Sequence, residues 1–302
     1  MHLIVLLTIF ALAWGLRYSW TEANQNTWSQ RWDRTLAIFL LPPLLLFTSA
    51  IAIIWMGPHG RMVWVGNDWV SYDLAIGFLG FAGFYLLKLA RSGRNMLQQV
   101  RTYPTTELSG KTVRILDLPT FYTAQIGFWK PELVITTCSI DTLATEHLEA
   151  VLAHEQAHYH YRDTWCFFWL GWIRQITTWL PQTEAMWQEL LLLRELRADR
   201  WASVQTDPLL VAEALLLVVH NTSVFTENLC TAFSQVAPVD RLNQRIEALL
   251  EISDDLDRQL QAIAEGRPRV NERIDTLPGY NLRSWAWSIV ALLPLLAVPF
   301  HT

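Results

Sequence analysis

Two histidines four residues apart, His154 and His158, form the strongest chemical signal in this sequence. The pattern from about residue 145 is helical, with Thr145 as the expected N-cap, so both side chains are expected on one helical face, about one turn apart. Two imidazoles placed in this way can bind one Zn²⁺, each at about 2 Å. Glu155 is rotated away from that face, so its carboxylate would lie beside a water molecule on the metal and take its proton. The H-E-x-x-H pattern on a helix therefore predicts a zinc peptidase site.

The five-residue pattern also occurs by chance in unrelated helices, so a third ligand decides between the two interpretations. Glu195 is the favoured candidate, and Asp199 follows it four residues later, on the same helical face. Glu195 would complete a site of two histidines and one glutamate, with the fourth position open for water. Asp199 would orient a ligand imidazole through its second ring nitrogen. Glu184 and Glu189 are rival ligands, but neither has an aspartate four residues further on.

A hydrolytic site also needs a hydrogen-bond donor for the oxyanion of the reaction. Nothing in the sequence chooses among four candidates, which are Tyr159, Tyr161, His220 and Arg241.

The composition indicates a membrane protein. Of 302 residues, 52% are hydrophobic and 17% are charged, whereas soluble domains carry about 25% charged residues. The net charge of −5 and the lack of a long basic run argue against direct nucleic-acid binding. The 3 cysteines are scattered, without a disulfide framework or a C-x-x-C metal site, which fits a reducing compartment.

Four stretches predict transmembrane helices, at about 3–20, 35–56, 70–87 and 284–300. The second stretch runs for 22 positions without a charge, and about 20 such residues cross a bilayer as a helix. A cleaved signal peptide is the alternative for the first stretch. The absence of a positive charge before it favours an uncleaved helix instead.

Basic residues beside the spans predict the orientation. They place residues 17–34 and 89–283 in the cytoplasm and both termini outside. The sequence thus divides into three spans in 1–88, a cytoplasmic domain over 89–283, and a fourth span. Short β-rich segments at 112–118 and 132–137 predict a small sheet within that domain. The expected fold is a mainly α integral membrane protein with a cytoplasmic α+β domain.

The tryptophan-rich segment 165–180 has two interpretations, a core helix or a hairpin that dips into the bilayer. Arg174 in its middle argues against a full span, since a central arginine costs roughly 2.5–3.5 kcal/mol on insertion scales.

Several stretches together resemble one known family. They are VLAHEQAHYHYRD, RELRADRWAS, FYTAQIGFWKPELVITTCSIDTL and RLNQRIEALLE. The sequence is similar to the membrane zinc metallopeptidases of the β-lactam-sensor (BlaR/MecR) type, which are gluzincins related to the HtpX and CAAX-protease group. The resemblance covers nearly the whole chain, including the arrangement of three spans, a cytoplasmic zinc domain and a fourth span.

The resemblance implies a role for each residue of the predicted site. His154, His158 and Glu195 would be the zinc ligands, Glu155 the catalytic base and acid, and Asp199 the partner of a ligand imidazole. An edge strand before the active helix would align the substrate. These implied roles agree with the roles expected from spacing.

One departure from the family concerns the signal. The β-lactam sensors carry a large penicillin-binding domain outside, after the fourth span, whereas this sequence ends at Thr302. We therefore do not expect this chain to recognise β-lactams. The resemblance still implies signal-dependent proteolysis that inactivates a winged-helix repressor of the BlaI/MecI type, in a bacterial cytoplasmic membrane. Self-association into a homo-oligomer is left open.

Two other functions compete with regulatory proteolysis. One is housekeeping cleavage of damaged membrane proteins, as in the HtpX and CAAX-protease group. The other is a receptor without catalysis, in which zinc is structural.

The segment MGPHGRM is a candidate sensor on the outer face. Met56, His59 and Met62 have thioether and imidazole side chains, which suit copper. An ordinary loop with two interfacial methionines is the alternative.

Overall fold

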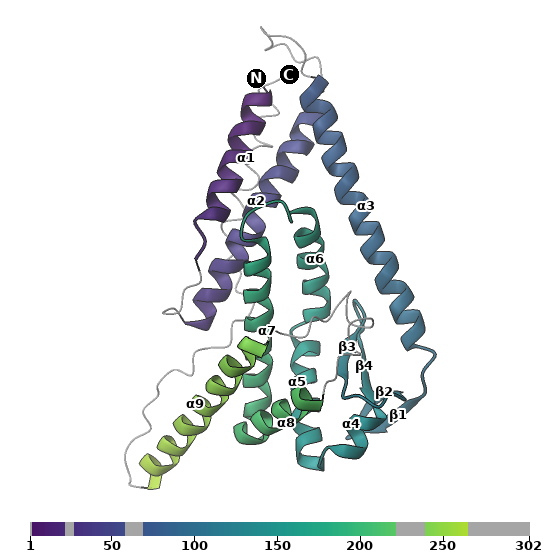
Figure 1. Ribbon diagram of the computed structural model, residues 1–302, viewed down its shortest axis with the longest axis vertical. Coiled ribbons are helices and arrows are strands. Elements are labelled where there is room, and N and C mark those ends of the chain that lie inside the picture. The colour runs from purple at the N-terminus through teal and green to yellow at the C-terminus, as the bar shows by residue number, and fades with distance from the viewer. Residues whose placement is uncertain (1, 22–26, 58–68, 222–238, 265–302) are drawn as a thin grey trace. The chain divides into compact units, whose positions relative to one another are not determined.

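The computed structural model describes residues 2–21, 27–57, 69–221 and 239–264 (Figure 1). The predicted fourth span at 284–300 lies outside these ranges, as do His59 and Met62 of the sensor hypothesis. The described chain is mostly helical with a small mixed sheet, which confirms the coarse fold prediction.

Contacts divide the chain into two compact units. Within the described residues, the first contains the chain up to Lys88 together with Leu170–Leu190, and the second contains Leu89–Trp169 together with the residues from Leu191 onward. The segment Leu170–Leu190 therefore groups with the N-terminal helices, although the sequence places it inside one domain of 89–283.

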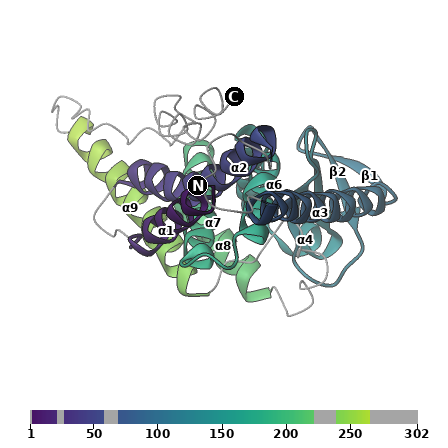
Figure 2. The same cartoon turned by 90° about the horizontal axis from the view of Figure 1, so that it is seen from above.

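Long apolar helices dominate the first unit. They are α1 (His2–Tyr18), α2 (Trp28–Met56) and the part of α3 (Trp69–Val100) up to Lys88. Of these, α2 and α3 are long and apolar enough to cross a membrane, and they contain the predicted spans 35–56 and 70–87. The apolar part of α1, Leu6–Tyr18, is shorter. The helices α1 and α2 contact each other and lie side by side in both views (Figures 1 and 2).

A proline in α2 explains an unusual buried arginine. Pro43 has no N–H, so the carbonyl of Phe39, four residues earlier, lacks its helical donor. Arg17 on α1 supplies a donor, because its Nη2 lies 2.8 Å from that carbonyl oxygen. Its Nη1 donates to Thr183 Oγ1 at 3.1 Å. The fully buried guanidinium thus ties α1 and α2 to the start of α7.

The tryptophan-rich segment 165–180 lies in α6 (Asp163–Ile176) and in the turn that leads to α7 (Thr183–Gln205). The indole N–H of Trp172 donates to the backbone oxygen of Ala82 in α3 at 2.9 Å. A buried ion pair joins Arg31 of α2 to Glu189 of α7 at 2.7 Å. The end of α6, the turn after it and the start of α7 therefore form a hairpin that packs against the N-terminal helices.

The second unit contains a four-stranded sheet. Its strands are β1 (Thr105–Leu108), β2 (Lys111–Leu116), β3 (Thr123–Ile126) and β4 (Glu132–Thr136), in the order β1-β2-β4-β3. The strands β2 and β4 are parallel, and the other two pairs are antiparallel. Both predicted β segments are confirmed as β2 and β4, whereas β1 and β3 were not predicted.

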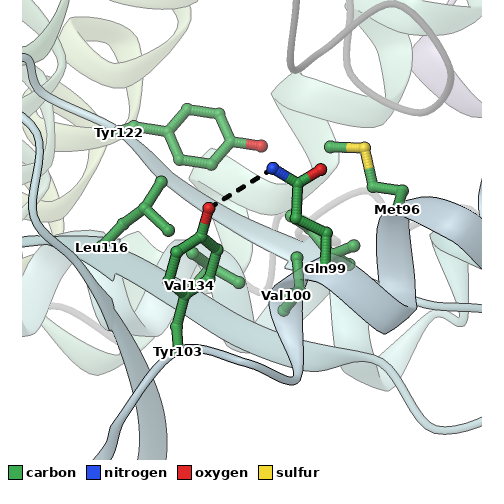
Figure 3. Close-up of a pocket in the computed structure, with 8 residues that line it drawn as sticks. Met96, Gln99, Val100, Tyr103, Leu116, Tyr122 and Val134 are labelled. Carbon is green, nitrogen blue, oxygen red and sulfur yellow. Dashed lines mark hydrogen bonds between the residues drawn. The ribbon is translucent and has the colours of Figure 1, made fainter.

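The two faces of the sheet carry different apolar clusters, as expected when side chains alternate along a strand. Val134 and Leu116 point to one face, where they pack with Val100 at the end of α3. A small, mostly apolar pocket lies at this face, and Gln99 donates to the Tyr103 hydroxyl beside it at 3.5 Å (Figure 3). Leu133 and Ile135 point to the opposite face, where the helix that carries the histidines packs.

The remaining helices of the second unit are α4 (Thr137–Thr142), α5 (Thr145–His160), α8 (Pro208–Asn221) and α9 (Val239–Ala264). The predicted helix for His154 and His158 is confirmed as α5. Its N-cap is Ala144 rather than Thr145, and no side chain bonds there. Leu148 and Leu152 of α5 pack on the sheet, while Ala150 and Ala153 pack with side chains of α7, α8 and α9. The α5 helix is therefore held on two sides.

Candidate metal centre

Three side chains converge between α5 and α7. The Nε2 atoms of His154 and His158 lie 3.1 Å apart. Glu195 places Oε2 at 3.3 Å from the Nε2 of His154 and Oε1 at 3.8 Å from the Nε2 of His158. For comparison, ligands about 2.0–2.1 Å from a tetrahedral ion are separated by about 3.3 Å. The cluster could therefore hold a metal ion with little movement.

The α7 helix is buried around most of its circumference where it passes the cluster. Leu191, Leu192, Leu193 and Leu196 are all buried. Charged side chains in such a segment need partners, because an unpaired charge is costly to bury. This requirement accounts for the ion pairs that surround Glu195 and Asp199.

The His154 imidazole is held from the rear by Asp199. The Nδ1 of His154 lies 2.8 Å from Oδ1 of Asp199. Since an ionised carboxylate only accepts, Nδ1 must carry the proton, and Nε2 is directed at the cluster. Arg245 of α9 binds both oxygens of Asp199, each at 2.7 Å, as a planar fork. The predicted role of Asp199 as an imidazole partner is compatible with this geometry.

The His158 imidazole has an analogous support that the sequence analysis did not identify. Its Nδ1 donates to Oδ2 of Asp163 at 2.8 Å. Asp163 begins α6 and forms a buried ion pair with Arg197 of α7. The guanidinium of Arg197 lies 4.1 Å from the ring centre of Tyr161. Both imidazoles therefore have an aspartate on Nδ1 and an arginine behind that aspartate.

The ion pairs keep the carboxylates of the centre ionised. Burial would raise the pKa of Glu195, but Arg194 and the hydrogen bond from His154 hold it well below its ordinary value. Burial likewise opposes ionisation of Asp199, and Arg245 outweighs it and lowers the pKa. Burial would lower the pKa of His154, but Asp199 and Glu195 raise it to about 10. A proton on His154 thus competes with a metal ion, so metal binding would release it.

Glu155 lies beside His154 on α5 and is buried, with 7% of its surface exposed. It acts electrostatically on Arg245. Burial would lower the pKa of that guanidinium, and the charges of Asp199, Glu195 and Glu155 together raise it. The predicted base therefore shares the electrostatic environment of the cluster.

The rival third ligands have other partners. Glu184 pairs with Arg174 at 2.8 Å, and Glu189 pairs with Arg31 at 2.7 Å. Both pairs belong to the first unit. Among the described side chains, Glu195 is the glutamate grouped with the two histidines.

The oxyanion candidates occupy varied positions. Tyr159 is 55% exposed, and the ring of Tyr161 packs against Arg197. His220 is exposed near the end of α8, and Arg241 lies one turn before Arg245 on α9. Of the sensor candidates, only Met56 is described, half-buried at the end of α2.

Four residues around the centre were missed as functional candidates: Asp163, Arg194, Arg197 and Arg245. Asp163 follows His158 by five residues, so its position just past the helix was a usable signal. Arg245 lies in RLNQRIEALLE, one of the stretches that carry the family resemblance. Nothing in the sequence assigned a partner to any of the three arginines, because their partners are set by how α7 and α9 pack.

No family model matches the chain, and a search of curated proteins finds no match. What the centre can do chemically follows from its donor atoms. Two imidazoles and one carboxylate suit catalytic zinc with water in the fourth position. The same donors also hold non-haem Fe(II) in other proteins, so the donor set alone admits more than one metal.

Proposed function

We propose that this chain is an integral membrane zinc endopeptidase. The observation that carries the proposal is the convergence of His154, His158 and Glu195, with Glu155 next to the first histidine on α5. The separations of the donor atoms fit one small divalent ion. The H-E-x-x-H order then favours zinc over iron, because it puts a carboxylate beside the ion without making it a ligand.

Zinc, when bound, lowers the pKa of a water molecule to about 7 and polarises a peptide carbonyl. Glu155 accepts a proton from the attacking water and delivers it to the leaving nitrogen as the peptide bond breaks. The aspartates keep both imidazoles in the tautomer that presents Nε2. The ligand side chains would thus bind the ion, the aspartates orient the imidazoles, and Glu155 moves the proton.

The edge of the sheet at β3 supports the proposal that the substrate is a peptide. β3 is the last strand in the order, and among the described strands it pairs only with β4. Its residues also contact α5, the helix with the histidines. An extended peptide can add to such an edge through backbone hydrogen bonds, which would align its bonds with the centre.

The biological role is proposed from the resemblance described above. α2 and α3 are compatible with membrane insertion, and we propose four spans with the zinc domain on the cytoplasmic side of a bacterial cytoplasmic membrane. The substrate would be a winged-helix repressor, whose cleavage switches genes on after a signal. Housekeeping cleavage of membrane proteins uses the same chemistry, with many substrates in place of one.

Replacement of Glu155 by glutamine tests this proposal. The variant keeps both histidines and Glu195, so it should retain the metal ion and lose cleavage. Proteomes of cells with the wild type and with Glu155→Gln would be compared. Glu149→Gln, on the exposed side of the same helix, is the matched control.

One protein that persists only in the Glu155→Gln cells would support regulatory proteolysis, and broad accumulation of membrane-protein fragments would support the housekeeping role. Full biological output from the Glu155→Gln variant would contradict catalysis and favour a receptor with structural zinc.

A further inference from the structure

Arg194 makes an unusual contact with the neighbouring Glu195. Its Nε and Nη2 both donate to one carboxylate oxygen, Oε1, at 2.9 and 2.6 Å. Adjacent side chains on a helix do not normally face each other. The Arg194 side chain must therefore fold back along α7, so the contact is not an automatic result of helical geometry.

The contact gives the two oxygens of Glu195 different surroundings. Oε1 takes both hydrogen bonds from Arg194 and lies 3.8 Å from the Nε2 of His158. Oε2 lies 3.3 Å from the Nε2 of His154 and 3.4 Å from Nη1 of Arg245. One oxygen is thus already occupied by hydrogen bonds, while the other is nearer to the imidazole nitrogen of His154.

Packing holds Arg194 in this position. Its guanidinium carbon lies 4.7 Å from the ring centre of Phe167 on α6. Its side chain is only 11% exposed. A guanidinium is planar and always charged, so a fixed ring beneath it also fixes the direction of its N–H groups.

We propose that Arg194 is a positioning residue that keeps Glu195 a monodentate ligand, bound through Oε2 alone. A carboxylate that bound through both oxygens would take up the space of an additional ligand. With Oε1 held by Arg194, two imidazoles and one oxygen leave a fourth position for water. This inference rests on the metal site proposed above.

Cobalt substitution reports coordination number directly. The full chain, purified in detergent and freed of metal, would be loaded with Co²⁺, whose visible d–d absorption is strong in tetrahedral sites and weaker in five-coordinate ones. Arg194→Met keeps much of the apolar stem over Phe167 but removes both donors. The matched control is Arg174→Met, since Arg174 also stacks on an aromatic ring, at 5.2 Å from Trp187, and pairs with a glutamate away from the centre.

We expect intense tetrahedral absorption from the wild type and the Arg174→Met control, and clearly weaker absorption from Arg194→Met at equal cobalt content. Peptidase turnover of Arg194→Met should fall by about tenfold or more, as for other partners of metal ligands. Arg194→Lys keeps the charge but cannot place two donors of a planar fork on one oxygen, so its absorption should also weaken.

An unchanged spectrum in a folded Arg194→Met variant overturns the inference while leaving the metal site intact. If Arg194→Met does not fold, an unchanged spectrum in Arg194→Lys does the same. Failure of the wild type to bind cobalt contradicts the metal site itself, and the role of Arg194 with it.

Discussion

The two histidines of the centre are supported by the same chemistry built from different parts of the fold. His154 is held by Asp199, and Asp199 is held by Arg245 from α9. His158 is held by Asp163, only five residues away at the start of the next helix, and Asp163 is held by Arg197 of α7.

The difference lies in what each arginine also touches. Arg245 reaches Glu195 at 3.4 Å as well as Asp199, so the His154 support connects two of the three ligands. Arg197 packs on Tyr161 and pairs with Asp163. Asp163 is also coupled electrostatically to Arg194, which binds Glu195. We therefore expect damage to the His154 support to reach Glu195 through a direct contact, and damage to the His158 support to reach it through a weaker, longer-range interaction.

The largest effect is expected from Arg245→Met. The variant leaves Asp199 as a buried carboxylate without the guanidinium that binds both of its oxygens. Breaking a buried ion pair in this way costs about 3–5 kcal/mol. The free energy of unfolding of the purified protein would be measured. Arg258→Met is the control, because Arg258 is 71% exposed and pairs with Asp255 on the surface of α9. Equal stability of Arg245→Met and the control would contradict the importance of the α9 contact.

Asp199→Asn and Asp163→Asn compare the two supports directly. Partners of metal ligands typically contribute about 10–100-fold to metal affinity. We expect the loss of metal affinity in Asp199→Asn to lie near the upper end of this range, because Arg245 would then lose the carboxylate that keeps it beside Glu195. The loss of metal affinity in Asp163→Asn should lie near the lower end of the range. Metal affinities from competition with a chelator would decide, and equal losses would remove the asymmetry.

The metal-free protein should also respond to pH through His154. The pKa of His154 is raised from 6.5 to about 10, so its protonated form stabilises the fold. That stabilisation is complete below pH 6.5 and is lost as the pH rises toward 10. Thermal unfolding of the metal-free protein should therefore occur at lower temperature as the pH rises through this window. Asp199→Asn should flatten the dependence, and an unchanged slope in that variant would place its origin elsewhere.

The smallest effect is expected from an ion-pair network away from the centre. Arg101 and Arg114 both bind Glu132 at the start of β4, and they lower its pKa although burial opposes this. Its stabilisation is present above pH 4.5 and is lost as the pH falls through the lowered pKa. Glu132→Gln should cost at most about 1 kcal/mol of stability, as expected for partly exposed pairs. Metal affinity should not change, and a tenfold loss would show that the sheet and the centre are coupled.

Local regularity explains which features could be predicted from the sequence. His154, Glu155 and His158 sit within one helical repeat, and Glu195 and Asp199 repeat the four-residue spacing. The strands β2 and β4 are rich in β-branched residues, whereas β1 and β3 have only four residues each. Elements that short give too little alternation to be distinguished from loops.

The remaining features depend on packing between distant segments. Arg245 stands 46 residues after Asp199, and no spacing rule connects them. Arg17 is buried because Pro43 frees a carbonyl on another helix. The hairpin Leu170–Leu190 groups with α1 and α2, and its contacts with them join residues more than a hundred positions apart. Side-chain type alone does not reveal such partners.

Metal content measured by mass spectrometry tests the central claim most directly. The full-length protein, purified without added metal or chelator, should contain close to one zinc ion per chain. A variant with His154→Ala and Glu195→Ala should contain almost none, while the exposed-face control Glu149→Gln should match the wild type. Wild-type protein without zinc, or equal zinc in the double variant, would contradict the assignment of His154, His158 and Glu195 as a metal centre.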